Sequence, residues 1–128
     1  RHARVEGKCL AHRERASKIS GSKVVPECDE NGDYRALQCH SANRNLCQCW
    51  DKNGSIVTGF RHKLLHCKCP LHKAKATKRK QKNVFVPECE ENGSYAPKQC
   101  FGDTGMCWCV DSDGERLREP TTFTIVCR

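Results

Sequence analysis

Residues 25–34 read VPECDENGDY and residues 86–95 read VPECEENGSY, so one ten-residue pattern occurs twice in this chain of 128 residues. The cysteines repeat in the same way, in two sets of six. Successive spacings are 19, 11, 8, 2 and 18 residues in the first set, and 20, 11, 7, 2 and 18 in the second. The sets are Cys9, Cys28, Cys39, Cys47, Cys49 and Cys67, then Cys69, Cys89, Cys100, Cys107, Cys109 and Cys127. A repeat of this kind predicts two copies of one small module.

The cysteine spacing places the first module at residues 1–68, with a short N-terminal extension at 1–8, and the second at residues 69–128. A core of this size supplies only about 3–5 kcal/mol, so covalent cross-links are expected. Twelve cysteines in 128 residues are typical of a disulfide scaffold in an oxidising compartment. Spacing alone leaves fifteen possible pairings for each set of six. No apolar run is long enough to span a membrane or to form a signal peptide, and we expect the mature part of a secreted, extracellular protein.

Turn signals divide each module into short elements. Asn-Gly and Asp-Gly pairs recur at matching places in the two modules and are typical of hairpin turns, because their residues tolerate positive φ. Helices are predicted at residues 10–17 and 70–75, with Pro70 suited to a first helical position. Strands are predicted at residues 34–39, 47–51, 95–100 and 106–111. The predicted fold is therefore small, disulfide-rich α+β, with a short helix and a small antiparallel sheet in each module.

These motifs resemble the thyroglobulin type-1 family, and the resemblance covers residues 9–128. The second module contains the whole family pattern, namely Pro87-Glu88-Cys89, Asn92-Gly93-Ser94-Tyr95, Gln99-Cys100 and Cys107-Trp108-Cys109-Val110. The first module departs at Cys47-Gln48-Cys49-Trp50, where Gln replaces Trp and Trp replaces Val. Residues i and i+2 of a strand share a face, so we expect Trp50 to fill the volume that Gln48 leaves empty.

The resemblance implies three disulfides in each module, between the first and second, third and fourth, and fifth and sixth cysteines. The implied pairs are Cys9–Cys28, Cys39–Cys47, Cys49–Cys67, Cys69–Cys89, Cys100–Cys107 and Cys109–Cys127. Each closes a modest local loop, for which one disulfide contributes about 3 kcal/mol in the chain-entropy model.

Some modules of this family, called thyropins, inhibit papain-like cysteine proteases such as cathepsins by inserting a three-loop wedge into the active-site cleft. Two modules without other domains are similar to the secreted two-module thyropins. The matching loops are residues 18–24, 40–46 and 56–61 in the first module, and 77–83, 101–106 and 116–121 in the second. The candidate protease-binding residues are Lys18, Ile19, Ser20, Gly21, Ser22, Ser41, Ala42, Asn43, Gly59, Phe60, Thr77, Lys78, Gly102, Asp103, Thr104, Gly105, Arg118 and Glu119. A wedge blocks its target without a reactive group, and disulfides at the loop bases reduce the entropy lost on binding.

The charge distribution indicates a second role. Residues 1–83 carry a net charge of +12, whereas residues 84–128 carry −4. Clustered cations bind sulfated polymers by releasing counterions, so we expect heparin- or heparan-sulfate-type glycosaminoglycans as partners. The candidate residues are Arg13, Arg15, Lys18, Lys23, Arg61, Lys63, Lys73, Lys75, Lys78, Arg79, Lys80 and Lys82. The alternative function is a non-inhibitory, extracellular glycosaminoglycan- or matrix-binding module, and the plainer interpretation of the charges is a solvated surface.

Other functions are less consistent with the sequence. No zinc-finger, helix-turn-helix or aromatic RNA-binding motif accompanies the basic residues, which argues against nucleic acid. The six-fold cysteine pattern does not match the Cys pairs of structural zinc sites. An even cysteine count leaves no spare thiol nucleophile, so we expect neither an enzyme nor a cofactor. Two N-glycosylation motifs are present, at Asn53-Gly54-Ser55 and Asn92-Gly93-Ser94, and the sequence alone does not separate them from ordinary turns. Loop sequence likewise leaves the target protease open, aspartic proteases included.

Overall fold

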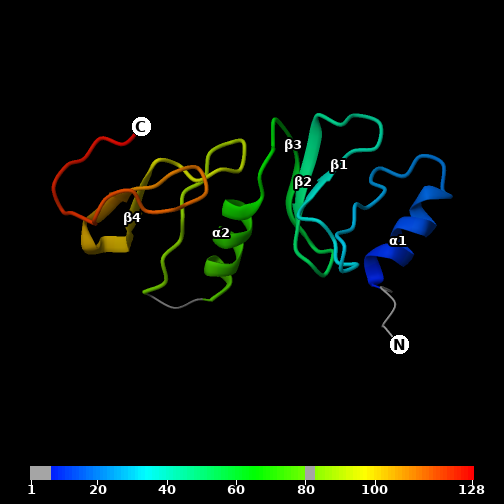
Figure 1. The fold of residues 1–128 in the computed structure, drawn as a ribbon, viewed down its shortest axis with the longest axis horizontal. Coiled ribbons are helices and arrows are strands. Elements are labelled where there is room, and N and C mark those ends of the chain that lie inside the picture. The colour runs from blue at the N-terminus through cyan, green and yellow to red at the C-terminus, as the bar shows by residue number, and fades with distance from the viewer. Residues whose placement is uncertain (1–6, 80–82) are drawn as a thin grey trace. The chain divides into compact units, whose positions relative to one another are not determined.

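The computed structural model describes residues 7–79 and 83–128, which divide between Leu64 and Leu65 into two compact units (Figure 1). The units divide four residues before the boundary that the cysteine spacing predicts. The N–H groups of Leu65 and His66 both donate to the carbonyl oxygen of Asn92, at 2.9 Å each. These hydrogen bonds join the segment before the second helix to the turn of the second module.

The first module contains helix α1 (Lys8–Ser17) and strands β1 (Leu37–Cys39), β2 (Leu46–Trp50) and β3 (Ile56–His62). The strands form one antiparallel sheet in the order β1-β2-β3 (Figure 1). The helix and two of the strands were predicted, but β3 was expected to be a loop. The segment is rich in β-branched and aromatic residues, which favour a strand once a neighbouring strand is available to pair with it.

The second module contains helix α2 (Lys68–Lys78), strand β4 (Lys98–Phe101), a 3-10 turn η1 (Gly102–Thr104) and strand β5 (Met106–Cys109). Strands β4 and β5 pair in antiparallel fashion. In place of a third strand there are isolated bridges, from Cys107 to Thr121 and from Val110 to Arg116. Helix α2 begins two residues earlier than predicted. Pro70 still lies in the first turn, where an N–H would have no partner within the helix.

Disulfides and aromatic rings together form the two small cores. The buried cluster of the first module consists of Cys9, Tyr34 and Trp50. The buried cluster of the second module consists of Cys69, Tyr95, Trp108 and Val110. The disulfides Cys9–Cys28, Cys39–Cys47, Cys69–Cys89, Cys100–Cys107 and Cys109–Cys127 are present. Cys49 and Cys67 are also disulfide-bonded, and none of the cysteines, all of which lie in the described ranges, is free.

The Gln–Trp exchange in the first module is accommodated by a hydrogen bond inside the core. Gln48 and Trp50 are both buried, and the indole Nε1–H of Trp50 donates to Oε1 of Gln48 at 2.9 Å. The Trp50 ring packs against Tyr34, with their centroids 5.4 Å apart. The two side chains thus meet on one side of β2, and the structure supports the hypothesis that Trp50 fills this volume.

A buried glutamine replaces missing backbone pairing in each module. Gln38 is fully buried; its Oε1 accepts the N–H of Glu27, and its Nε2 donates to the carbonyl oxygens of Glu27 and Arg35. Gln99 makes the equivalent three bonds, to Glu88 and Ala96. Each glutamine therefore ties the segment that follows the first loop to the start of the sheet.

Candidate functional site

The first and second candidate loops of the first module are joined by hydrogen bonds. The backbone N–H of Ser41 donates to the carbonyl oxygen of Lys23 at 2.7 Å. The Ser41 hydroxyl donates to the carbonyl oxygen of Ser22 at 2.6 Å. Ser22 in turn donates its hydroxyl to the carbonyl oxygens of Ala16 and Ile19, which fixes the first loop to the end of α1. These two loops therefore form a single ordered surface next to the sheet.

The end of β3 reaches this same surface. Leu46, where β2 begins, pairs with His62, and the rings of His40 and Phe60 lie 5.4 Å apart. Directly after the strand, Lys63 adopts a φ of 64°, in the left-handed region. Three chain segments of the first module thus converge at one end of its sheet.

The third candidate loop of this module was wrongly placed. Residues 56–61 lie in β3, and Ile56 pairs with Trp50 at the far end of β2. Gly59 lies in the middle of the strand, and Phe60 reaches the loop end only through its ring. An antiparallel strand must run from one end of the sheet to the other, so the segment at the loop end is His62-Lys63. Sequence reasoning did not assign these two residues to the protease-binding loops, although the Asn-Gly turn at residues 53–54 would have set this register.

The candidate loops of the second module are exposed and are held at their bases. The Cys100–Cys107 disulfide closes the 101–106 loop, and the Thr104 hydroxyl donates to the carbonyl oxygen of Phe101 at 2.7 Å. Thr121 exchanges two backbone hydrogen bonds with Cys107, which brings the 116–121 segment to the same place. Arg118 and Glu119 are exposed. Of the first loop, Thr77 and Lys78 are exposed residues of α2, and residues 80–82 lie outside the described ranges.

Glycines at the loop tips leave room for a partner to approach. Gly105 has a φ of +78°, and a Cβ atom built on it would meet no atom within 4 Å. Gly21 in the first module is equally open. Any side chain there would project into solvent, where an approaching surface would meet it first.

The basic candidate residues differ between the modules in how far they are neutralised. In the first, Arg13 pairs with Glu27 at 3.5 Å and Lys18 with Glu14 at 3.3 Å. In the second, α2 contains no acidic residue, and its basic side chains make no ion pair among the described residues. The exposed candidates are Arg13, Arg15, Lys18, Lys23, Arg61, Lys63, Lys73, Lys75, Lys78 and Arg79, whereas Lys80 and Lys82 lie outside the described residues.

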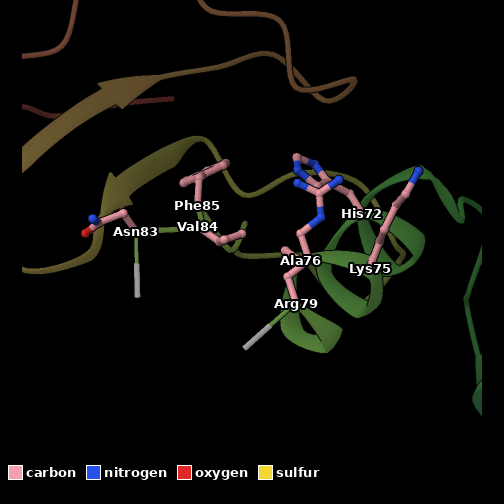
Figure 2. A pocket seen from close by; sticks show the side chains of 7 residues that line it. All are labelled: His72, Lys75, Ala76, Arg79, Asn83, Val84 and Phe85. Carbon is pink, nitrogen blue, oxygen red and sulfur yellow. The ribbon is translucent and has the colours of Figure 1, made fainter. Parts of the chain in front are cut away.

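A pocket of about 510 Å³ lies beside this basic helix. It is lined by His72, Lys75, Ala76, Arg79, Asn83, Val84 and Phe85. Figure 2 shows its basic side chains coming from α2, with Val84 and Phe85 supplied by the segment that follows. Basic groups and apolar carbon therefore meet in one hollow of the second module.

A histidine–tyrosine pair, which sequence reasoning missed, connects each helix to its core. Nδ1 of His72 lies 2.8 Å from the Tyr95 hydroxyl, and Nδ1 of His12 lies 2.9 Å from that of Tyr34. Burial, followed by the charges of Lys68 and Lys75, lowers the pKa of His72, and burial raises the pKa of Tyr95. Both residues recur at matching positions of the repeat, a signal that was available in the sequence.

The described side chains include no free thiol and no cluster of metal-ligating groups. All twelve cysteines are disulfide-bonded, so the chain has neither a thiol nucleophile nor a thiolate ligand. Within residues 7–79 and 83–128, no three His, Cys, Asp or Glu side chains gather as they would around a metal ion. No helix in these ranges combines the length and the apolar character needed to cross a membrane.

Comparison with known proteins identifies the repeat. The model of the thyroglobulin type-1 repeat matches the chain twice, at residues 4–69 and 66–124. The chain therefore belongs to the thyroglobulin type-1 family, as its motifs predicted. This confirms a small disulfide-rich fold of two such modules.

Two relatives match this chain along most of their own length, and a third, longer relative matches it over part of its length. U20-hexatoxin-Hi1a from Hadronyche infensa is 36% identical over 130 residues, which cover 98% of this chain and 89% of that protein. U24-ctenitoxin-Pn1a from Phoneutria nigriventer is 35% identical, with 90% of each chain covered. Equistatin from Actinia equina is 37% identical over 100 residues, which cover 72% of this chain and 42% of equistatin.

Proposed function

We propose that this protein is a secreted inhibitor of papain-like cysteine proteases of the cathepsin type, which occludes the active-site cleft with the loop end of a module. The observation that carries the proposal is the convergence of three chain segments in the first module, with hydrogen bonds between Ser41 and residues 22–23 and ring contact between His40 and Phe60. Membership of a family that includes thyropins supports it. The six disulfides support an extracellular location.

The mechanism requires shape and rigidity in place of catalysis. Cross-links at the loop bases keep the free and bound conformations alike, so little conformational entropy is lost on binding. The open glycines Gly21 and Gly105 allow the loop backbone to approach the walls of the cleft. In the first module the third segment of the wedge is His62-Lys63, which replaces the Gly59-Phe60 pair suggested by the sequence.

The test is an inhibition titration against papain and a panel of cathepsins, with pepsin and trypsin added to separate other protease classes. Gly21→Arg and Gly105→Arg place a long side chain on one loop end each and should weaken inhibition by the module that carries them. Ser55→Arg and Ser112→Arg are matched controls, because they add the same charge at exposed turns away from the loop ends. Circular dichroism shows whether each variant is folded. Unchanged inhibition in both folded glycine variants would contradict the wedge assignment, and absence of inhibition by the wild type would contradict the function.

A second proposed function is binding of heparin-type glycosaminoglycans by α2. The observation in its favour is that Lys75, Lys78 and Arg79 are exposed and unpaired among the described residues, on a helix without acid. Changing these three to Ala should lower the salt concentration at which the protein elutes from heparin. A control variant with Arg35, Arg44 and Lys52 changed to Ala has the same net charge as this variant. If both variants elute at the same salt concentration, heparin attracts the protein by its net charge alone.

A further inference from the structure

The two N-glycosylation motifs lie in turns that are not equivalent in the repeat. Asn53-Gly54-Ser55 occupies the turn between β2 and β3, whereas Asn92-Gly93-Ser94 lies before the sheet of the second module. A glycan needs an asparagine whose side-chain nitrogen is accessible, on a part of the surface with space for a bulky sugar chain. The structure separates the two motifs by the exposure of their residues and by the hydrogen bonds that their side chains make.

Asn53 stands at the tip of its turn with its side chain unused. Both Asn53 and Ser55 are exposed. The turn is closed by Asp51, whose Oδ1 accepts the N–H groups of Asn53 at 2.9 Å and Ser55 at 3.0 Å. The backbone carbonyl of Asn53 also takes part in a hydrogen bond, accepting from Nζ of Lys8 at 3.2 Å. The Asn53 side chain forms no hydrogen bond among the described residues, so a sugar on it would disrupt no interaction.

Asn92 is part of the packing of its module. Its Oδ1 accepts both the N–H of Ser94, at 2.9 Å, and the Ser94 hydroxyl, at 2.7 Å. Ser94 is only 9% exposed. The Asn92 carbonyl also accepts the N–H groups of Leu65 and His66. The segment before α2 therefore lies against this turn, and the serine that a glycosylating enzyme must recognise is buried.

We propose that Asn53 is the N-glycosylation site of this protein and that Asn92 is not modified. In the reaction, Nδ2 of Asn53 forms a bond to C1 of the first N-acetylglucosamine of a lipid-diphosphate-linked oligosaccharide. The bond from C1 to the diphosphate oxygen breaks, the lipid diphosphate leaves, and the amide nitrogen gives up one proton. The donor and the transferase belong to the secretory pathway.

The position of Asn53 keeps such a glycan away from the candidate loop end. Strand β2 begins at Leu46, the last residue of the 40–46 loop, and ends at Trp50, shortly before the Asn53 turn. The hairpin pairing places Leu46 opposite His62 at one end and Trp50 opposite Ile56 at the other. The sugar would extend from the far end of the sheet and leave the converging loops uncovered.

The test is to secrete the full chain from cultured mammalian cells and to map occupancy by peptide mass spectrometry after removal of N-glycans with peptide N-glycosidase. The digestion is carried out in ¹⁸O-labelled water beside a control without the enzyme, because Asn-Gly sequences also deamidate spontaneously and take up the label from that water. We expect residue 53 to be labelled above the level of the control, residue 92 to be labelled only to that level, and the glycan mass to be lost in Ser55→Ala. An unmodified Asn53, or an Asn92 occupied to the same extent, would overturn the proposal. Because the readout is mass, it does not depend on whether the protein inhibits a protease.

Discussion

The buried glutamines offer a direct measure of what holds each module together. Gln38→Met keeps nearly the same side-chain length but removes all three hydrogen bonds to Glu27 and Arg35, and it leaves the N–H of Glu27 without its acceptor. At about 1 kcal/mol for each hydrogen bond, the first module should lose about 3 kcal/mol. Small domains have total stabilities of only about 5–15 kcal/mol, so this is a large fraction.

The assay is thermal unfolding of wild type, Gln38→Met and Gln99→Met, followed by hydrogen exchange of the backbone amides. For a module of this size, about 3 kcal/mol corresponds to a fall in the melting temperature of about 12–24 °C. Gln38→Met should speed exchange in the first module and Gln99→Met in the second, so each variant is the control for the other. A fall of less than about 4 °C in both variants would show that methionine replaces the glutamine without loss, and would refute the view that these side chains stand in for backbone pairing.

Two further predictions concern the second module. Folding lowers the pKa of His72 from 6.5, so His72 takes up its proton more readily in the unfolded chain than in the folded one. The free energy of unfolding should therefore decline as the pH falls below 6.5. His72→Gln should make the melting temperature less dependent on pH between about 7.5 and about 5, whereas an unchanged slope would exclude this histidine as the cause. Gly114→Ala should destabilise the second module more than Gly105→Ala does, although both glycines have a positive φ. A Cβ atom at residue 114 would lie 2.8 Å from the Tyr95 ring, whereas a Cβ atom at residue 105 would meet no atom within 4 Å. Such overpacking costs about 1–3 kcal/mol, and equal melting temperatures for the two alanine variants would contradict the reasoning.

Local sequence signals located most of the secondary structure. The Asn-Gly and Asp-Gly turns, and the approximate places of α1, α2, β2, β4 and β5, could be inferred from patterns that act within a few residues. Strand β3 could not be recognised in this way, because its pairing with β2 is a tertiary contact. That single error misplaced the third loop of the first module. Its correction moves the candidate site from Gly59 and Phe60 to His62 and Lys63.

Other features depend on where side chains lie in the fold. The sequence presented Asn53 and Asn92 as equivalent motifs, and only hydrogen bonds and burial distinguish them. It also showed basic residues in both modules, but not that acidic neighbours neutralise some of those in the first.

The sequence by itself determined that this protein is a tandem repeat, that each module depends on disulfides, and which family the modules belong to. These conclusions follow from the number and spacing of the cysteines, which are fixed along the chain, and from motifs that can be compared directly. The tertiary structure alone decided which segments meet at the loop end, which glutamines and hydroxyls are buried, and which charges remain unpaired. Those properties depend on contacts between residues far apart in the chain, which no local pattern encodes.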